Sequence, residues 1–150
     1  AGSGFFQHGH TYIGHPVATA AALAVVRAML DRGLVQRSAE MGEKLQAALV
    51  ERFGQHPNVG DIRGRGLFRG IELVADRETK TPFASSLGLA KKIKKAAFEA
   101  GLICYPMSGT RDGVNGDHIL LAPPFIITED QIGEVVDKLE LAIGQCLPKG

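Results

Sequence analysis

The sequence VGDIRGRGLFRGIEL occupies residues 59–73 and decides the fold of this chain. Short apolar pieces rich in valine and isoleucine alternate in it with glycines at positions 60, 64, 66 and 70. This texture is typical of β-strands, and it predicts two extended segments joined around residues 63–66. Because glycine inside a strand marks a bulge or a close backbone approach, we expect one of these features in the hairpin.

Helical patterns lie on both sides of this hairpin. Residues 34–53 carry apolar side chains at helical spacing, with charged residues on the other side. Residues 87–100 fit a second helix, which Gly101 ends. Thr128 begins the last helix and has Gln131 three residues later, which is a capping-box pattern. The stripes expected to face the core are Met41, Leu45, Ala48, Leu49 and Phe53, then Leu89, Ile93, Ala96 and Ala97, then Ile132, Val135, Val136, Leu139 and Ile143.

Two further strands are expected between the last two helices. They cover residues 102–105 and 118–122, and a glycine-rich loop at residues 106–117 joins them. Together with a helix at residues 16–31, the order is helix, helix, strand, strand, helix, strand, strand, helix. This order predicts an α+β fold, in which a small, mostly antiparallel sheet is covered by helices.

The segment before residue 34 has a different character. Residues 1–14 are rich in glycine and histidine and are expected to form a loop. Residues 17–31 are apolar on almost every side, which is typical of a helix sandwiched between larger bodies. We therefore expect the isolated chain to dimerise or to be poorly soluble. Since residue 1 is alanine, we expect the chain to be a piece of a longer protein or a processed one.

Composition excludes several classes of protein. The formal net charge is +1, so no strong overall field attracts nucleic acid or a membrane surface. No apolar run approaches the ~20 residues that span a bilayer. The two cysteines, Cys104 and Cys146, lack the spacing of a redox or zinc site and are expected to be unpaired thiols in a reducing compartment. We therefore expect a cytoplasmic protein with neither a nucleic-acid nor a membrane partner.

The most distinctive chemistry lies in HGHTYIGHP, residues 8–16. Its three histidines suggest a metal site, but no carboxylate or cysteine nearby completes one, so we expect no bound metal. Composition alone also allows a structural loop with exposed histidines. A third interpretation fits better, because a threonine hydroxyl and backbone N–H groups just ahead of a helix can bind an anion such as phosphate.

This run, followed by an alanine-rich helix, resembles the H-G-x-T-[YF]-x-G-H-P segment of class III (ω-amino-acid type) PLP-dependent aminotransferases. In that family the threonine reaches across the dimer interface and binds the phosphate of the neighbouring subunit's pyridoxal 5'-phosphate. Thr11 matches this threonine, and His10 stands where the family often places an aromatic residue beside the same cofactor. The resemblance implies a cofactor-phosphate loop (residues 1–15), an interdomain helix (16–33) and the C-terminal small domain of a PLP fold-type I aminotransferase (34–150).

The arginines among the glycines of residues 63–66 raise a second possibility, a contact with RNA. The segment is too short and its flanks are too apolar for that role. It resembles the family's V-R-G-x-G-L-x-x-G-I-E-L strand pair, which is chiefly structural and whose glycines let strand and helix backbones come close. Arg63 and Arg65 are therefore not site candidates. The lysines at 91, 92, 94 and 95 are expected to form a solvated helix face.

The substrate end of the site is expected near residues 101–128, which resemble the family's last strand pair and its A-P-P-x-x-[IV]-T signature. Many members carry a mobile arginine that pairs with a substrate carboxylate where this chain has Tyr105. Arg111, in the following loop, is the nearest candidate substitute, and a solvated loop charge is the alternative. Tyr105 and Arg111 are therefore our substrate-binding candidates.

No catalytic residue is expected in this chain. In the family, the Schiff-base lysine and the acid partner of the pyridinium nitrogen lie upstream, so the isolated chain should not transaminate. The whole enzyme, expected to be a homodimer through its large domain, would pass an amino group from an amine or amino acid to a keto acid or aldehyde. The alternatives are another fold-type I reaction (decarboxylase, epimerase or aminomutase) and a non-catalytic interaction module.

Overall fold

The hairpin predicted from residues 59–73 is present in the computed structural model, which describes residues 2, 4 and 8–148. Strands β1 (Val59–Arg65) and β2 (Phe68–Leu73) pair antiparallel around a turn at residues 66 and 67. Their register shifts between Val59 and Asp61, so Gly60 forms a bulge. A Cβ atom on Gly60 would lie 2.8 Å from Val74 Cγ1, so this glycine also marks a close approach. The expectation of a bulged, closely approached hairpin is confirmed.

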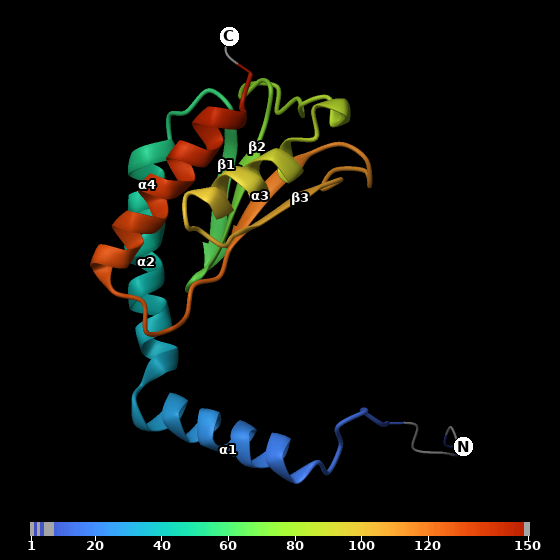
Figure 1. Ribbon diagram of the computed structural model, residues 1–150, viewed down its shortest axis with the longest axis vertical. Coiled ribbons are helices and arrows are strands. Elements are labelled where there is room, and N and C mark those ends of the chain that lie inside the picture. The colour runs from blue at the N-terminus through green and yellow to red at the C-terminus, as the bar shows by residue number, and fades with distance from the viewer. Residues whose placement is uncertain (1, 3, 5–7, 149–150) are drawn as a thin grey trace. The chain divides into compact units, whose positions relative to one another are not determined.

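The hairpin forms one half of a four-stranded antiparallel sheet (Figure 1). The strand order is β1-β2-β4-β3, with β3 (Tyr105–Ser108) at one edge and β4 (Asp117–Leu121) beside β2. The predicted strand at residues 118–122 is confirmed within one residue at each end, and the α+β prediction is confirmed.

The prediction that a strand covers residues 102–105 is wrong, because the third strand begins at Tyr105 and continues into the predicted loop. Leu102 is still tied to the preceding helix, since its N–H donates to the Ala97 carbonyl at 2.8 Å. Pro106 lies within this strand, because β3 is at the edge of the sheet and proline is tolerated on an edge strand. Ser108 Oγ, 2.6 Å from Asp117 Oδ1, extends the pairing to the far end of the hairpin.

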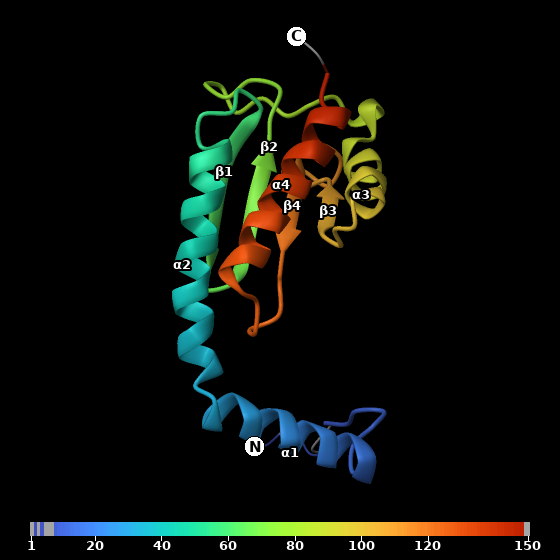
Figure 2. The ribbon, with the colours of Figure 1, turned by 60° about the vertical axis from the view of Figure 1, so that its left-hand side comes forward.

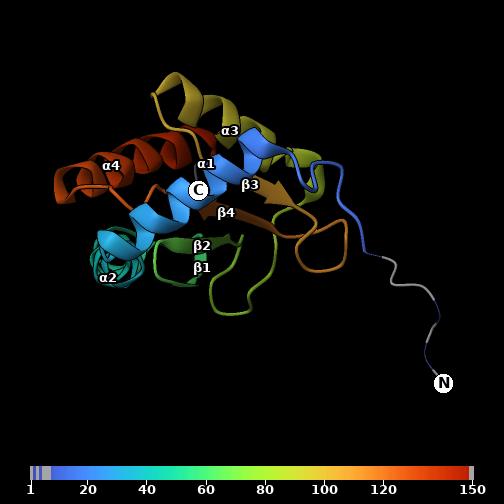
Figure 3. The ribbon, with the colours of Figure 1, turned by 90° about the horizontal axis from the view of Figure 1, so that it is seen from below.

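Three helices cover one face of the sheet: α2 (Leu34–Phe53), α3 (Leu89–Glu99) and α4 (Glu129–Cys146) (Figures 2 and 3). A short 3₁₀ turn, η1 (Ser85–Leu87), precedes α3, and Gly88 with its φ of 58° separates the two. The predicted helix at residues 87–100 is therefore confirmed with a break near its start. The lysines of α3 are exposed, as expected.

The core lies between this face and the helices. On β2 and β4 alternate residues are buried, and the inward set includes Ile71, Leu73, Ile119 and Leu121. The predicted helical stripes are confirmed, since every member is buried or packs against the core cluster. The other face of the sheet has no helix of residues 36–148 on it in Figure 2, which leaves it open.

The capping box at the start of α4 is confirmed. Thr128 Oγ1 accepts from Gln131 N–H at 3.3 Å, and Gln131 Oε1 accepts from Thr128 N–H at 3.0 Å. We predict that Thr128→Ala lowers the free energy of unfolding by ~1 kcal/mol, because an N-terminal N–H loses its partner. Urea unfolding of the chain measures this loss, and Thr128→Ser, which keeps the hydroxyl, should restore most of it.

Residues 1–35 form a separate compact unit, and residues 36–150 form the other. Within the first unit, α1 (Pro16–Asp31) matches the predicted helix, and none of its residues is buried. Val17 and Leu30 expose 70% and 72% of their surface. Among the residues that the structure describes, no helix is both long and apolar enough to cross a membrane.

Candidate functional site

The first group of candidate residues lies in the turn before α1. The Ile13 N–H donates to the His10 carbonyl, and the His15 N–H donates to the Tyr12 carbonyl, both at 3.0 Å. Gly14 completes this turn with a φ of 75°, a left-handed conformation that glycine adopts at little cost. Thr11 is exposed within the turn. The predicted loop therefore has a defined fold from residue 10 onward.

The histidines of this segment have separate roles. His15 is the N-cap of α1, and its Nδ1 accepts from the Ala18 N–H at 3.3 Å. The rings of His8 and His10 meet edge to face, with their Nε2 atoms 3.2 Å apart. Across the residues described, no group of three or more histidine, cysteine or acidic side chains is placed to hold a metal ion.

The chemistry of this turn fits a phosphate. Pro16 occupies the first turn of α1, which contains no acidic residue, so the positive end of the helix dipole adjoins the turn. The Thr11 hydroxyl can donate to an anion, and so can His10 when its ring carries an N–H toward it. The turn thus carries an exposed hydroxyl close in sequence to the N-terminal end of α1, where His15 already accepts from the Ala18 N–H.

The second group lies on the β3–β4 hairpin. Tyr105 pairs with Leu120 on the open face of the sheet, and 57% of its surface is exposed. Arg111 lies in the connecting loop, where its side chain is exposed and its N–H donates to the Asn115 carbonyl at 3.0 Å. Three residues of strand, about 10 Å, separate Tyr105 from the start of this loop at Ser108. The hairpin therefore carries both candidates, but Tyr105 lies at the start of β3 and Arg111 lies in the loop beyond its end.

The loop that carries Arg111 is held by Asp112. Asp112 Oδ1 accepts from the N–H groups of Asn115 and Val114 at 2.7 and 2.9 Å. Asn115 Nδ2 donates to Asp112 Oδ2 at 2.9 Å. These bonds, first those from Asn115 and then that from Val114, lower the pKa of Asp112 to about 2, because they stabilise the carboxylate. Asp112 therefore stays ionised at neutral pH.

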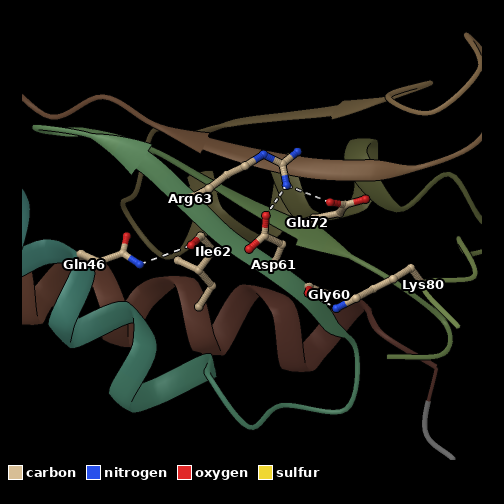
Figure 4. A network of polar contacts seen from close by, with 7 residues as sticks. All are labelled: Gln46, Gly60, Asp61, Ile62, Arg63, Glu72 and Lys80. Carbon is tan, nitrogen blue, oxygen red and sulfur yellow. Dashed lines mark hydrogen bonds and ion pairs between the residues drawn. The ribbon is translucent and has the colours of Figure 1, made fainter. Parts of the chain in front are cut away.

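A pocket on the open sheet face, with mainly apolar walls and a few polar side chains, was missed by sequence reasoning. Its polar lining is Arg63, Glu72, Thr110 and His118. Arg63 lies between Asp61 and Glu72, with its Nη1 2.7 and 2.9 Å from their carboxylates (Figure 4). These two carboxylates, Glu72 first, raise the pKa of Arg63. The interpretation of Arg63 as structural is supported, because its charge is already paired. Only the register of β1, β2 and β4, which the sequence does not reveal, brings these residues together.

The two cysteines are not candidates themselves, although Cys104 directly precedes Tyr105. Both are free thiols, as expected, and both are half-buried. Burial raises the pKa of the Cys104 thiol, so it is a weaker nucleophile than an exposed cysteine.

The sequence profile described as Aminotransferase class-III matches residues 2–143. The chain belongs to the class-III aminotransferase family. Enzymes of this family are in general PLP-dependent.

Individual members of the class-III family support this assignment. An aminotransferase of Gibberella zeae is 46% identical over 95% of this chain, which spans 28% of that protein. A solved aminotransferase of Bacillus anthracis is 40% identical with a TM-score of 0.82, over 96% of this chain and 32% of its own. A leucine/methionine racemase of Thermococcus litoralis is 36% identical over 91% of this chain and 28% of its own length. The chain therefore spans about 30% of the length of these relatives.

Proposed function

We propose that this chain is the C-terminal portion of a PLP-dependent class-III aminotransferase that moves an amino group from an amine or amino acid to a keto acid or aldehyde. Residues 1–15 serve as the cofactor-phosphate loop, 16–33 as the interdomain helix and 34–150 as the small domain. The whole enzyme is a cytoplasmic homodimer. The observation that carries the proposal is the family match through residues 2–143, which includes the phosphate-suited turn before α1.

In this proposal the chain positions the cofactor and the substrate. Pyridoxal phosphate, when bound, supplies an electron sink for the reacting carbon of the substrate. Thr11 donates its hydroxyl to the phosphate of the cofactor in the neighbouring subunit, and the dipole of α1 favours the same negative charge. His10 lines the cofactor site. Tyr105 and Arg111 shape the substrate end, where Arg111 binds a carboxylate with two parallel N–H donors.

Thr11 provides the test of the cofactor role. In the complete polypeptide, Thr11→Val removes one hydrogen bond to a charged group, a loss of about 1.5–3 kcal/mol. We therefore expect cofactor binding roughly tenfold to a hundredfold weaker, measured by titrating the apoenzyme with pyridoxal phosphate and following its absorbance.

The control for this prediction is Thr11→Ser, which keeps the hydroxyl and should retain most of the affinity. Thr19→Val is a matched control in the same unit, because the Thr19 hydroxyl donates to the His15 carbonyl inside the helix at 2.8 Å. Equal cofactor affinity in Thr11→Val and in the unaltered enzyme would contradict the proposed role.

The isolated chain should be inactive, because the aldimine lysine of the family lies upstream. Mixed with pyridoxal phosphate, the 150-residue chain should give no absorbance band of an internal aldimine. An internal-aldimine band on this chain would contradict the proposal that the Schiff-base lysine lies upstream of it.

Racemisation is the second candidate reaction of the complete enzyme, because a racemase is among the relatives at 36% identity. With a single chiral amino acid and no keto-acid acceptor, a racemase inverts the amino acid, whereas an aminotransferase leaves its configuration unchanged. Chiral chromatography of the reaction mixture separates the two functions.

A further inference from the structure

The loop between β3 and β4 contains the one asparagine of this chain that precedes a glycine. The chain has two asparagines, Asn58 before Val59 and Asn115 before Gly116. A following glycine matters chemically, because its backbone nitrogen has no neighbouring Cβ to block attack on the asparagine side chain. Valine is branched at Cβ and shields that nitrogen.

The two asparagines differ in their hydrogen-bond partners as well as in the residue that follows each of them. Asn58 Nδ2 donates to the carbonyls of Val74 and Ala75 at 3.0 and 3.3 Å, which ties it to the end of β2. Asn115 lies in a loop whose residues 110–114 are all exposed, and its side chain donates to the Asp112 carboxylate. The Asn115 side-chain amide is held by Asp112 of the same loop, while Asn115 itself is half-buried and Gly116 is buried.

We propose that Asn115–Gly116 is a site of spontaneous deamidation in this protein. The Gly116 nitrogen forms a bond to Asn115 Cγ, the Cγ–Nδ2 bond breaks, and the proton lost from the Gly116 nitrogen leaves with Nδ2 as ammonia. Water then opens the resulting ring at either of its two carbonyl carbons. Breaking the new bond at Cγ leaves aspartate at position 115, and breaking the original peptide bond leaves isoaspartate. No oxidant or reductant is needed.

The product cannot keep the native loop. Asn115 Nδ2 donates to Asp112 Oδ2 at 2.9 Å, and a carboxylate at the same place has no hydrogen to donate. Because Asp112 is ionised, two negative charges would then face each other within the loop. Isoaspartate routes the main chain through Cβ and Cγ, which adds one carbon before Gly116. The Asn115 carbonyl, which accepts from Arg111, becomes a carboxylate outside the main chain, and the Gly116 carbonyl, which accepts from Thr110, is displaced. Either product releases the segment that holds Arg111.

The consequence for substrate rests on the proposed function, whereas the chemical step does not. If Arg111 binds a substrate carboxylate, deamidation loosens that contact as the protein ages. Mass spectrometry measures the covalent change directly, and its result does not depend on any aminotransferase activity.

The experiment incubates the full chain at neutral and mildly alkaline pH and follows both asparagines by peptide mass spectrometry. We expect the mass increase of replacing NH₂ by OH at Asn115, at a rate at least about tenfold above that of Asn58. A tenfold ratio requires a difference of only ~1.4 kcal/mol in activation free energy. Asp112 also precedes a glycine, but its isomerisation changes no mass and is not confused with this reaction.

Two controls make the outcome decisive. A synthetic peptide of residues 111–118 gives the rate without the fold, and Asp112→Ala frees the Asn115 side chain from its partner and should accelerate the reaction. Asn115→Asp copies one product, and faster amide exchange at residues 109–116 in that variant is the expected sign of an opened loop. An Asn115 that stays intact while the peptide converts, or an Asn58 that converts equally fast, would overturn the proposal.

Discussion

Replacing Gly42 by alanine is expected to destabilise the protein by about 2–3 kcal/mol. An added Cβ would lie 2.2 Å from the Gly66 carbonyl oxygen and 2.6 Å from Gly66 Cα, and both are backbone atoms that cannot rotate away. Alanine also favours helix by ~1 kcal/mol over glycine, which offsets part of the loss. Urea unfolding of the variant and of the unaltered chain measures the difference.

A shift of α2 away from the hairpin would relieve the clash at further cost. Arg69 is 4% exposed, and its Nη2 donates to the Gly42 carbonyl at 2.9 Å, while its Nη1 donates to the Gly64 carbonyl at 3.0 Å. Moving the helix would stretch the first of these bonds and leave a buried guanidinium N–H poorly paired, which is costly. Relaxation is therefore expected to remove only part of the clash.

The matched control is Gly133→Ala on α4, where no atom lies within 4 Å of the added Cβ. There the change should raise the free energy of unfolding by about 0.5–1 kcal/mol, because alanine loses less backbone entropy. If the free energy of unfolding falls in Gly42→Ala and rises in Gly133→Ala, the close approach of Gly66 to Gly42, and not the helical position of the glycine, causes the destabilisation. A loss below ~1 kcal/mol at Gly42 would mean that α2 and the hairpin separate easily.

The hairpin and helices were predictable because their signals are local. Glycine spacing in residues 59–73, apolar stripes at helical spacing and the Thr128–Gln131 capping box each lie within a few residues. The close approach of a helix to a hairpin glycine was also expected from the family pattern. Its partner Gly42 was not identified, because glycine within a helical pattern gives no sign of what packs on it. Only the folded structure pairs Gly42 with Gly66.

The prediction of the third strand failed, and two other features were not foreseen, because tertiary context overrides local signals there. Pro106 is a strand breaker by composition, yet it lies in β3 because that strand is at the sheet edge. Arg69 alternates with Ile71 and Leu73 on the core face, where a charge survives because carbonyls and Glu43 surround it. The pocket around Arg63 and His118 depends on the register of strands far apart in sequence.

Arg111→Ala is expected to have the largest effect on activity. In the complete enzyme, losing a paired guanidinium should cost about 2–3 kcal/mol, roughly a hundredfold in kcat/KM, for an amino donor that carries a carboxylate. A donor amine without a carboxylate should react at nearly the unaltered rate, because it makes no use of Arg111. Lys94→Ala removes an exposed positive charge on α3 and is the control for a general change of charge.

Tyr105→Arg then separates the two ways in which the chain can bind a carboxylate. By the family resemblance, Tyr105 matches the strand position at which many members carry a mobile arginine, and it pairs with Leu120 on the open face of the sheet. Introduced together with Arg111→Ala, this arginine should recover much of the lost kcat/KM for the carboxylate donor, because the guanidinium returns from the strand instead of the loop. Recovery would place the substrate carboxylate between the two positions. Unchanged activity with both donors in Arg111→Ala would instead identify Arg111 as a solvated loop charge, and an equal loss with both donors would mean that its removal disturbs the fold of the hairpin.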